Sequence, residues 1–192
     1  MPGKPIINEV KMKLFTVIFV LLVMPLVMLA QDAQNEKCEI KNKLINDDRS
    51  GKPMLIGYCD RSALEDSTFS WWFNSEYDNY EVNKEALEPI QKNLNDYRFT
   101  IVMGTWCSDS RREIPRFYRI VDDMGINEDN IKLIMVDHGL KTQKGEIDSL
   151  DIKAVPTIIM YKDGKELGRI VESPETTLEG DLTAIAEGKK KS

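Results

Sequence analysis

The sequence is poor in the residue types that build metal and phosphate sites. It has 192 residues, with a single histidine and three cysteines. The histidine, His138, follows a predicted strand as a turn residue, and no second soft ligand lies at a spacing that zinc sites use. No glycine-rich phosphate loop or low-complexity tract is present. These absences predict a protein without a metal and without a bound cofactor.

Positive charge is also scarce. The formal net charge is −6, with 32 acidic residues against 26 basic ones. Because an acidic surface repels phosphate backbones, we expect no nucleic-acid partner. The basic tail at 189–192 is too short to form a binding patch, and we interpret it as a solvated end.

Long hydrophobic runs are missing except near the N-terminus. Residues 14–30 carry no charge, follow Met12-Lys13 and end at the small residue Ala30. A short basic start, an apolar stretch and a small residue at its exit are typical of a secretory signal peptide. We therefore predict an exported protein from which residues 1–30 are cleaved. The alternative is an uncleaved anchor, which would be the one contact with a membrane.

The three cysteines are Cys38, Cys59 and Cys107. Oxidising compartments permit disulfides, and an odd number of cysteines leaves at least one thiol unpaired in a monomer. A Cys38–Cys59 disulfide with Cys107 free is the simplest arrangement, although the spacing alone does not fix this pairing.

Hydrophobic periodicity predicts a mixed α/β domain. Apolar runs at 99–103 and 131–136 are typical of buried strands, and the amphipathic segment between them predicts a helix that ends at Gly125. A crossover helix implies parallel pairing of these strands. The further expected elements are a strand at 54–58, a helix from the high eighties to Asn95, a short helix near 147–152, strands at 157–161 and 167–171 joined by an antiparallel turn at Asp163-Gly164, and a helix from Ser173-Pro174 to Gly188.

The chain before this domain is interpreted as an N-terminal extension over 31–82, ahead of the folded domain at 83–188. Residues 31–52 are polar and lack periodicity, so we expect a linker there. Residues 60–82 are rich in aromatic side chains. Packing of these rings against the domain is the favoured interpretation, and a groove for a peptide partner is the alternative.

Cys107 lies where a predicted buried strand ends and a predicted helix begins. A sulfur at a helix N-terminus meets unpaired backbone N–H groups and the positive end of the helix dipole, which favour the reactive thiolate. Arg111 and Arg112 add positive charge one turn along, whereas Asp109 opposes it. An inert buried cysteine is the alternative.

Spacings around this cysteine resemble the thioredoxin family over residues 85–187. The segment Trp106-Cys107-Ser108-Asp109-Ser110 corresponds to the W-C-x-x-C motif of that family, and Pro115 to its helix proline. Pro156 is similar to its cis-proline, and Gly164 to its hairpin glycine. The single-cysteine C-x-D-S pattern also looks like a bacterial subfamily. The resemblance implies a thioredoxin-like fold with a central mixed sheet flanked by helices, and export would then place the protein in the periplasm.

The resemblance also implies roles for individual residues. Cys107 would be the nucleophile, and Trp106, Val155 and Pro156 would form the substrate-binding wall. The second motif cysteine is replaced by Ser110, which cannot form a disulfide and is expected to hydrogen-bond to the thiolate.

These roles predict monothiol exchange with protein thiols or disulfides. The cycle would be completed by an external thiol reductant, or by Cys38 or Cys59 as a distant resolving group. A non-catalytic protein-interaction module on the same fold is the alternative, so the sequence leaves open whether the protein is an enzyme.

Overall fold

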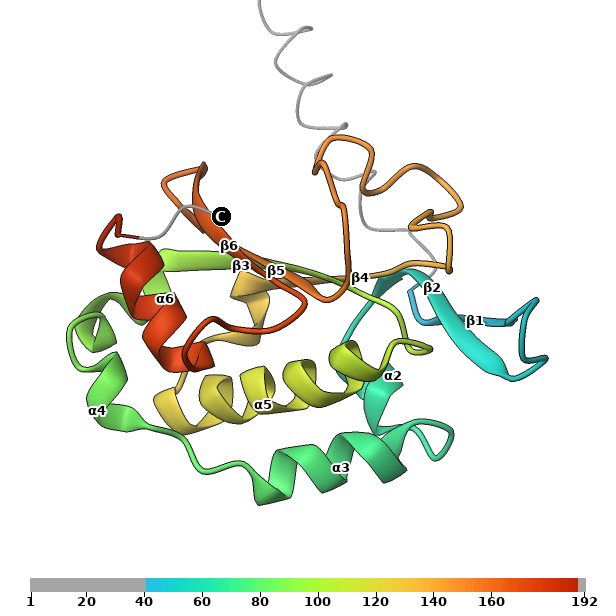
Figure 1. Ribbon diagram of the computed structural model, residues 1–192, viewed down its shortest axis with the longest axis horizontal. Helices are drawn as coiled ribbons and strands as arrows, with labels where there is room; N and C mark the ends of the chain where they lie inside the picture. Colours follow the sequence, from blue (N-terminus) through green and yellow to red (C-terminus); the bar gives the residue numbers. More distant parts are fainter. Residues whose placement is uncertain (1–40, 190–192) are drawn as a thin grey trace, which may run out of the picture. The chain divides into compact units, whose positions relative to one another are not determined.

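A computed structural model describes residues 41–189. These residues form a six-stranded sheet of order β1-β2-β4-β3-β5-β6 with helices packed against it (Figure 1). Strands β3 and β4 are parallel, and the other neighbouring strands are antiparallel. The predicted mixed central sheet is thereby confirmed. The strands are β1 (Lys43–Asn46), β2 (Pro53–Cys59), β3 (Tyr97–Met103), β4 (Ile131–Met135), β5 (Thr157–Lys162) and β6 (Lys165–Val171).

The helices flank this sheet, and Figure 1 shows α5 running along one face with α3 beyond it. Within residues 41–189 the α-helices are α2 (Ser62–Glu65), α3 (Ser70–Asn79), α4 (Lys84–Leu87), α5 (Ser108–Met124) and α6 (Leu178–Ala186), and the 3-10 helices are η2 (Gln91–Asp96) and η3 (Glu128–Asn130). None of these helices combines the length and the apolar character needed to cross a bilayer. The predicted signal peptide and Cys38 lie outside the described residues.

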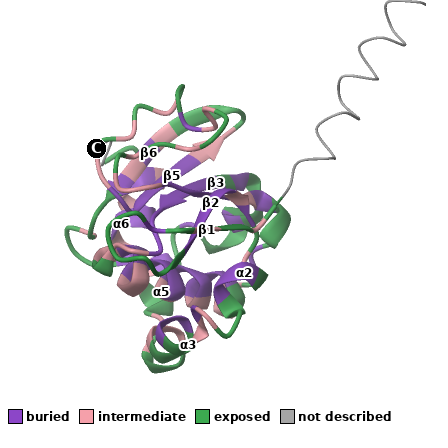
Figure 2. Cartoon of the chain, turned by 90° about the vertical axis from the view of Figure 1, so that its right-hand side faces the viewer, coloured by how far each residue is buried: buried purple, intermediate pink, exposed green. Residues whose placement is uncertain are grey.

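The main core lies between the sheet and α5. Alternate residues of β3 face the helices, so Phe99 and Ile101 join the same cluster as Ile114 and Phe117 of α5. The rings of Phe99 and Phe117 meet edge to face with centroids 5.3 Å apart. Most residues of β2, β3 and β5 are buried, and these strands are largely purple in Figure 2. The predicted buried strand and amphipathic helix are confirmed, and α5 ends at Gly125 with φ of 65°.

A second, smaller core covers the opposite face of the sheet. Val102 and Ile134 point to this face because neighbouring strand residues alternate in direction. They pack against Ile147 and Val155 from the long connection between β4 and β5. This connection, residues 136–156, has turns and bends in place of the short helix expected near 147–152. Long connections of this kind inside a compact domain are commonly functional.

Three further predictions need correction. The expected linker at 31–52 contains β1, which pairs with β2 in an antiparallel hairpin. The expected helix ending at Asn95 is divided into α4 and η2, with Pro89 in the turn between them. The last helix begins at Leu178 and not at Ser173-Pro174, because the Thr177 hydroxyl caps it by accepting a hydrogen bond from the Gly180 N–H at 3.1 Å.

The aromatic segment packs against the domain as favoured from the sequence. Phe69, Trp72 and Phe73 are buried, whereas Trp71 is 68% exposed. The Asp163-Gly164 turn between β5 and β6 is also confirmed, with φ of 51° and 75°.

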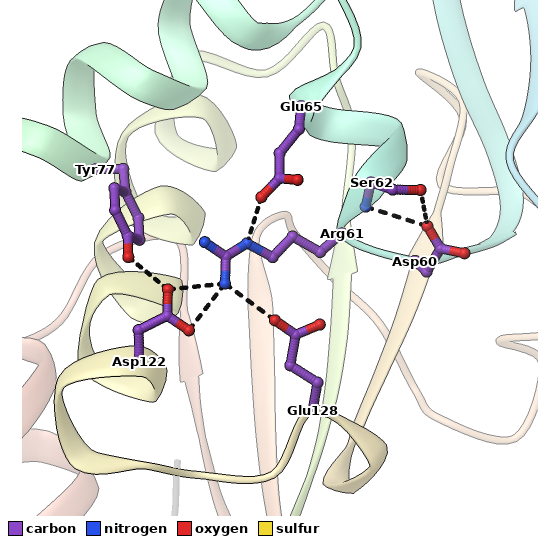
Figure 3. A network of polar contacts seen from close by, with 7 residues as sticks. All are labelled: Asp60, Arg61, Ser62, Glu65, Tyr77, Asp122 and Glu128. Atoms are coloured by element: carbon purple, nitrogen blue, oxygen red, sulfur yellow. Dashed lines mark hydrogen bonds and ion pairs between the residues drawn. The ribbon is translucent and has the colours of Figure 1, made fainter.

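Arg61 ties the aromatic segment to α5 (Figure 3). Its guanidinium forms ion pairs with Glu65 at 2.7 Å, Asp122 at 2.8 Å and Glu128 at 3.0 Å. The same group lies 5.2 Å from the ring centroids of Tyr77 and Tyr118. Because these partners come from α2, α3, α5 and η3, the single cation links four helical segments.

Candidate functional site: the Cys107 edge of the sheet

Cys107 is the N-cap residue of α5, at the carboxyl end of β3. Its φ and ψ are −82° and 127°, so the chain is still extended there before it coils. The Cys107 N–H donates to the Gly104 carbonyl at 3.0 Å, and the Cys107 carbonyl accepts from the Arg111 N–H at 3.1 Å. The residue is partly exposed, so the inert, fully buried alternative does not fit this geometry.

The thiol of Cys107 faces the loop before β5. Its Sγ donates a hydrogen bond to the Val155 carbonyl oxygen at 3.2 Å. The Val155–Pro156 peptide bond is cis, as the resemblance implied. The Pro156 carbonyl accepts from the Glu172 N–H at 2.7 Å, and the Thr157 hydroxyl donates to the Ala154 carbonyl at 2.8 Å, so this loop is held on both sides. The structure therefore brings Cys107, Val155 and Pro156 together.

Trp106 lies beside Cys107 and is oriented by the loop after β4. Its indole Nε1 donates to the Val136 carbonyl at 2.9 Å, and its ring stacks on the His138 imidazole with centroids 4.1 Å apart. Gly104 allows this arrangement, because a Cβ atom there would approach the Trp106 ring to 2.5 Å.

Ser110 occupies the position of the second motif cysteine and is fully buried. Its Oγ accepts a hydrogen bond from the Gly104 N–H at 3.4 Å. Ser110 thus contacts the turn that carries Cys107, whereas its predicted hydrogen bond to the thiolate stays a prediction.

The two arginines at the start of α5 have different partners. Arg112 forms ion pairs with Asp109 at 2.8 Å and with Glu113 at 2.6 Å, and these carboxylates, Glu113 foremost, raise the pKa of Arg112. Asp109 is therefore engaged with a cation. Arg111 instead donates from Nε to the Thr105 carbonyl at 2.5 Å, and among residues 41–189 it forms no ion pair with a carboxylate.

Cys59 is in a different environment from Cys107. It lies at the end of β2 with 6% of its surface exposed, within the main core. Burial raises the pKa of the Cys59 thiol to about 12. A thiol with such a pKa supplies little thiolate at neutral pH. The predicted pairing of Cys59 with Cys38 stays a prediction, since Cys38 lies outside the described residues.

Sequence reasoning missed a polar contact next to Trp106. His138 is a turn residue as expected, but its Nε2 also lies 3.0 Å from Asp47 Oδ1, on the loop of the β1–β2 hairpin. Asp47 is 5% exposed and accepts hydrogen bonds from the Ser50 hydroxyl at 2.6 Å and the Arg49 N–H at 3.0 Å. The Ser50 hydrogen bond is the main cause that lowers the pKa of Asp47 to about 2. No sequence signal linked positions 47 and 138, because β1 itself was not predicted.

A cleft of about 260 Å³ lies between this hairpin and the Trp106 turn. Arg49, Lys52 and Arg111 line it together with Asp47, Trp106 and His138. Residues 41–189 contain no group of three or more histidine, cysteine, aspartate or glutamate side chains placed to hold a metal ion.

Comparison of the sequence with known proteins finds one relative. A thioredoxin of Coprinus comatus is 30% identical over 95 residues, which are 48% of this chain and 86% of that protein. The chain belongs to the thioredoxin family. Among thioredoxins, it is thus a member whose second motif position is Ser110. No family model matches the sequence.

Solved structures give matches of lower similarity. Thioredoxin O2 from Arabidopsis thaliana, in its oxidised state, is 19% identical, with a TM-score of 0.34 over 56% of this chain and 86% of that chain. A protein of unknown function from Pseudomonas aeruginosa is 21% identical, with a TM-score of 0.47 over 70% of this chain and 82% of that chain.

Proposed function

We propose that this thioredoxin-family protein carries out monothiol thiol–disulfide exchange on protein substrates through Cys107. The observation that carries the proposal is the position of the Cys107 sulfur, partly exposed at the N-terminus of α5 and 3.2 Å from the carbonyl before a cis-proline. The unpaired N–H groups and the dipole of a 17-residue helix favour a thiolate at this end. Thiolate is the form that attacks disulfides.

The reaction begins when the Cys107 thiolate attacks one sulfur of a substrate disulfide. A bond forms between the two sulfurs, the substrate disulfide breaks, and the second substrate sulfur leaves as a thiolate. Ser110 has no sulfur with which to displace the mixed disulfide. The release of the substrate is therefore assigned to an external thiol, with Cys38, which lies outside the described residues, as the alternative resolving group.

The Val155–Pro156 segment supports the substrate in this mechanism. An extended peptide can pair with backbone groups at such a segment, as in strand addition to a sheet. Before the Cys107 thiol loses its proton, its hydrogen bond to the Val155 carbonyl holds the sulfur beside this backbone. Trp106, fixed by Val136 and His138, forms the adjoining wall.

Cys59 is a poor resolving group in the described structure. Its thiol is buried in the main core and has a pKa raised to about 12. This supports an external thiol as the partner that completes the cycle.

The test compares the two described thiols in two variants of the protein. We expect iodoacetamide to alkylate Cys107 at neutral pH faster than a free peptide cysteine, in a variant with Cys38→Ser and Cys59→Ala. The control for a buried thiol is a matched variant with Cys38→Ser and Cys107→Ala, in which Cys59 is the remaining cysteine. We expect this variant to react far more slowly. Alkylation of Cys107 no faster than the free peptide would remove the basis of the proposal.

Substrate trapping tests the same proposal on proteins. The full chain should form reducible mixed disulfides with exported proteins, and Cys107→Ala should form none of these adducts. Equal adducts with both proteins would show that another cysteine carries the exchange.

We also propose export to the periplasm, on the basis of the uncharged stretch at 14–30 followed by the small residue Ala30. Expression of the full chain in a Gram-negative host, followed by cell fractionation and N-terminal sequencing, tests this. A mature protein that begins near residue 31 is expected, whereas full-length protein in the cytoplasm would contradict it.

A further inference from the structure

The cleft beside Trp106 has a charge opposite to that of the protein as a whole. The chain carries a net charge of −6, yet Arg49, Lys52 and Arg111 all line this cleft of about 260 Å³. Asp47 is the one carboxylate among the lining residues. Its contacts with His138 and the Ser50 hydroxyl leave its charge in place, so three cations face one carboxylate and positive charge predominates among the lining residues.

Arg111 is the cation best placed to bind a ligand near the sulfur. Its Nε is held by the Thr105 carbonyl at 2.5 Å, and its backbone N–H by the Cys107 carbonyl at 3.1 Å. The guanidinium is thus anchored one helical turn from Cys107. Among residues 41–189 no carboxylate pairs with Arg111, and its remaining N–H groups suit a carboxylate because the fork of an arginine matches the two oxygens.

We propose that this cleft binds the carboxylates of a small anionic thiol or disulfide, which serves as the external thiol that Cys107 requires. The inference rests on the proposed exchange function. The size of the cleft suits a small molecule, and the walls formed by Trp106, Pro53 and Met54 supply apolar surface for its carbon chain. Cys107 does not line the cleft but follows Trp106 in the chain, so the ligand has to extend from Arg111 past the Trp106 ring to reach its sulfur.

The exchange steps balance without another oxidant or reductant. In a mixed disulfide between Cys107 and a substrate protein, the small thiolate attacks the Cys107 sulfur, and the substrate leaves as a thiolate. A second small thiolate then attacks the sulfur of the first small molecule in the new mixed disulfide. This attack forms the small disulfide and releases Cys107 as a thiolate. In sum, one protein disulfide becomes two thiols, and two small thiols become one small disulfide.

The reverse of the second step gives a direct assay. The Cys107 thiolate is mixed with one of three small disulfides, which are dithiodipropionate with two carboxylates, neutral hydroxyethyl disulfide and cationic cystamine. Mass spectrometry then follows the rate at which each disulfide modifies Cys107 in protein with Cys38→Ser and Cys59→Ala. Every rate is divided by the rate of the same disulfide with a free cysteine peptide, which removes intrinsic differences in reactivity.

We expect the normalised rate for dithiodipropionate to exceed that for the neutral disulfide by about tenfold at low salt, and cystamine to be slowest. Arg111→Gln and Lys52→Gln should each reduce this ratio by about threefold or more. Lys92→Gln is the matched control, because Lys92 is exposed in η2, at the other end of β3 and about 20 Å of strand away. Its ratio should equal that of the unsubstituted protein.

The outcomes separate the inference from the function on which it rests. Equal normalised rates for the three disulfides, or a ratio that Arg111→Gln and Lys52→Gln leave unchanged, would overturn the anionic cleft while the exchange function stands. If Cys107 reacts with none of the disulfides, the exchange function fails. Calorimetric titration of Cys107→Ser with dithiodipropionate then judges the cleft alone, where binding that Arg111→Gln abolishes supports it and absence of binding refutes it.

Discussion

Arg61 and Arg111 lie in opposite electrostatic surroundings. Arg61 is enclosed by three carboxylates at 2.7–3.0 Å and by the rings of Tyr77 and Tyr118. Arg111 is held by a backbone carbonyl and, among residues 41–189, pairs with no carboxylate. The same side chain links helices where carboxylates neutralise its charge, whereas the charge of Arg111 is left for the anionic ligand proposed above.

Removal of Arg61 should give the largest loss of stability. We expect Arg61→Ala to reduce the free energy of unfolding by about 3 kcal/mol, because it leaves Glu65, Asp122 and Glu128 without their cation. Partial exposure of these carboxylates keeps the loss at the lower end of the range for buried pairs. Urea denaturation measures it.

The control for this change is the reactivity of Cys107. Its alkylation rate should stay within about twofold in Arg61→Ala, since the two sites lie on different parts of the fold. A large change in that rate would contradict the proposal that Arg61 acts on stability alone while Arg111 acts at the Cys107 site.

A methyl group at Gly104 should disturb the Cys107 edge instead. Its Cβ would approach the Trp106 ring to 2.5 Å, so we expect Gly104→Ala to cost about 2 kcal/mol and to displace the indole. Near-ultraviolet circular dichroism and the alkylation rate of Cys107 should both change. Gly139→Ala is the matched control, because its nearest atom, Asp137 Oδ1, lies at 3.3 Å; equal effects of the two changes would contradict the steric argument.

Removal of the Ser110 hydroxyl should have a smaller effect on stability. Ser110→Ala leaves the Gly104 N–H without its acceptor, which should reduce the free energy of unfolding by about 1 kcal/mol. We also expect slower alkylation of Cys107 at neutral pH if the hydroxyl stabilises the thiolate. A rate equal to that of the unsubstituted protein would limit Ser110 to holding the turn.

Asp47 provides a prediction about how stability depends on pH. The pKa of Asp47 is lowered from 3.8 to about 2 in the folded protein, first by the Ser50 hydroxyl and then by the Arg49 N–H. A carboxyl with a lowered folded-state pKa stabilises the fold above its unfolded value and loses that contribution as the pH falls through the folded one. The difference in melting temperature between the unsubstituted protein and Asp47→Asn should therefore be full above about pH 4 and shrink towards pH 2. A difference that is constant from pH 7 to pH 2 would contradict this role.

Much of the fold was predictable because its central elements follow strong local patterns. The apolar run at 99–103 and the helical spacing from Ile114 to Val121 identified β3 and α5, and Gly125 marked the end of α5. β1 was missed because the residues of a short, exposed edge strand carry little hydrophobic pattern. The start of α6 was misplaced because Ser173-Pro174 and Thr177 are both plausible caps, and only the hydrogen bond to Gly180 distinguishes them.

The candidate site was predictable only at the residues that match the thioredoxin motifs. The resemblance to thioredoxins implied that Cys107 and Pro156 lie together, and the structure adds the 3.2 Å contact with Val155. The cleft formed by Asp47, Arg49 and His138 was not predictable, because it depends on how an unpredicted hairpin meets the loop after β4. Contacts between distant segments of this kind leave no local pattern in the sequence.

The stacking of His138 on Trp106 gives the protein a built-in spectroscopic reporter. The chain has one histidine, so a proton NMR spectrum contains a single set of imidazole resonances and needs no isotope labelling to assign them. With the indole 4.1 Å away, ring currents make those resonances sensitive to small movements of the tryptophan. Titration of a candidate small molecule can therefore be followed, at the wall nearest the reactive sulfur, by one pair of lines.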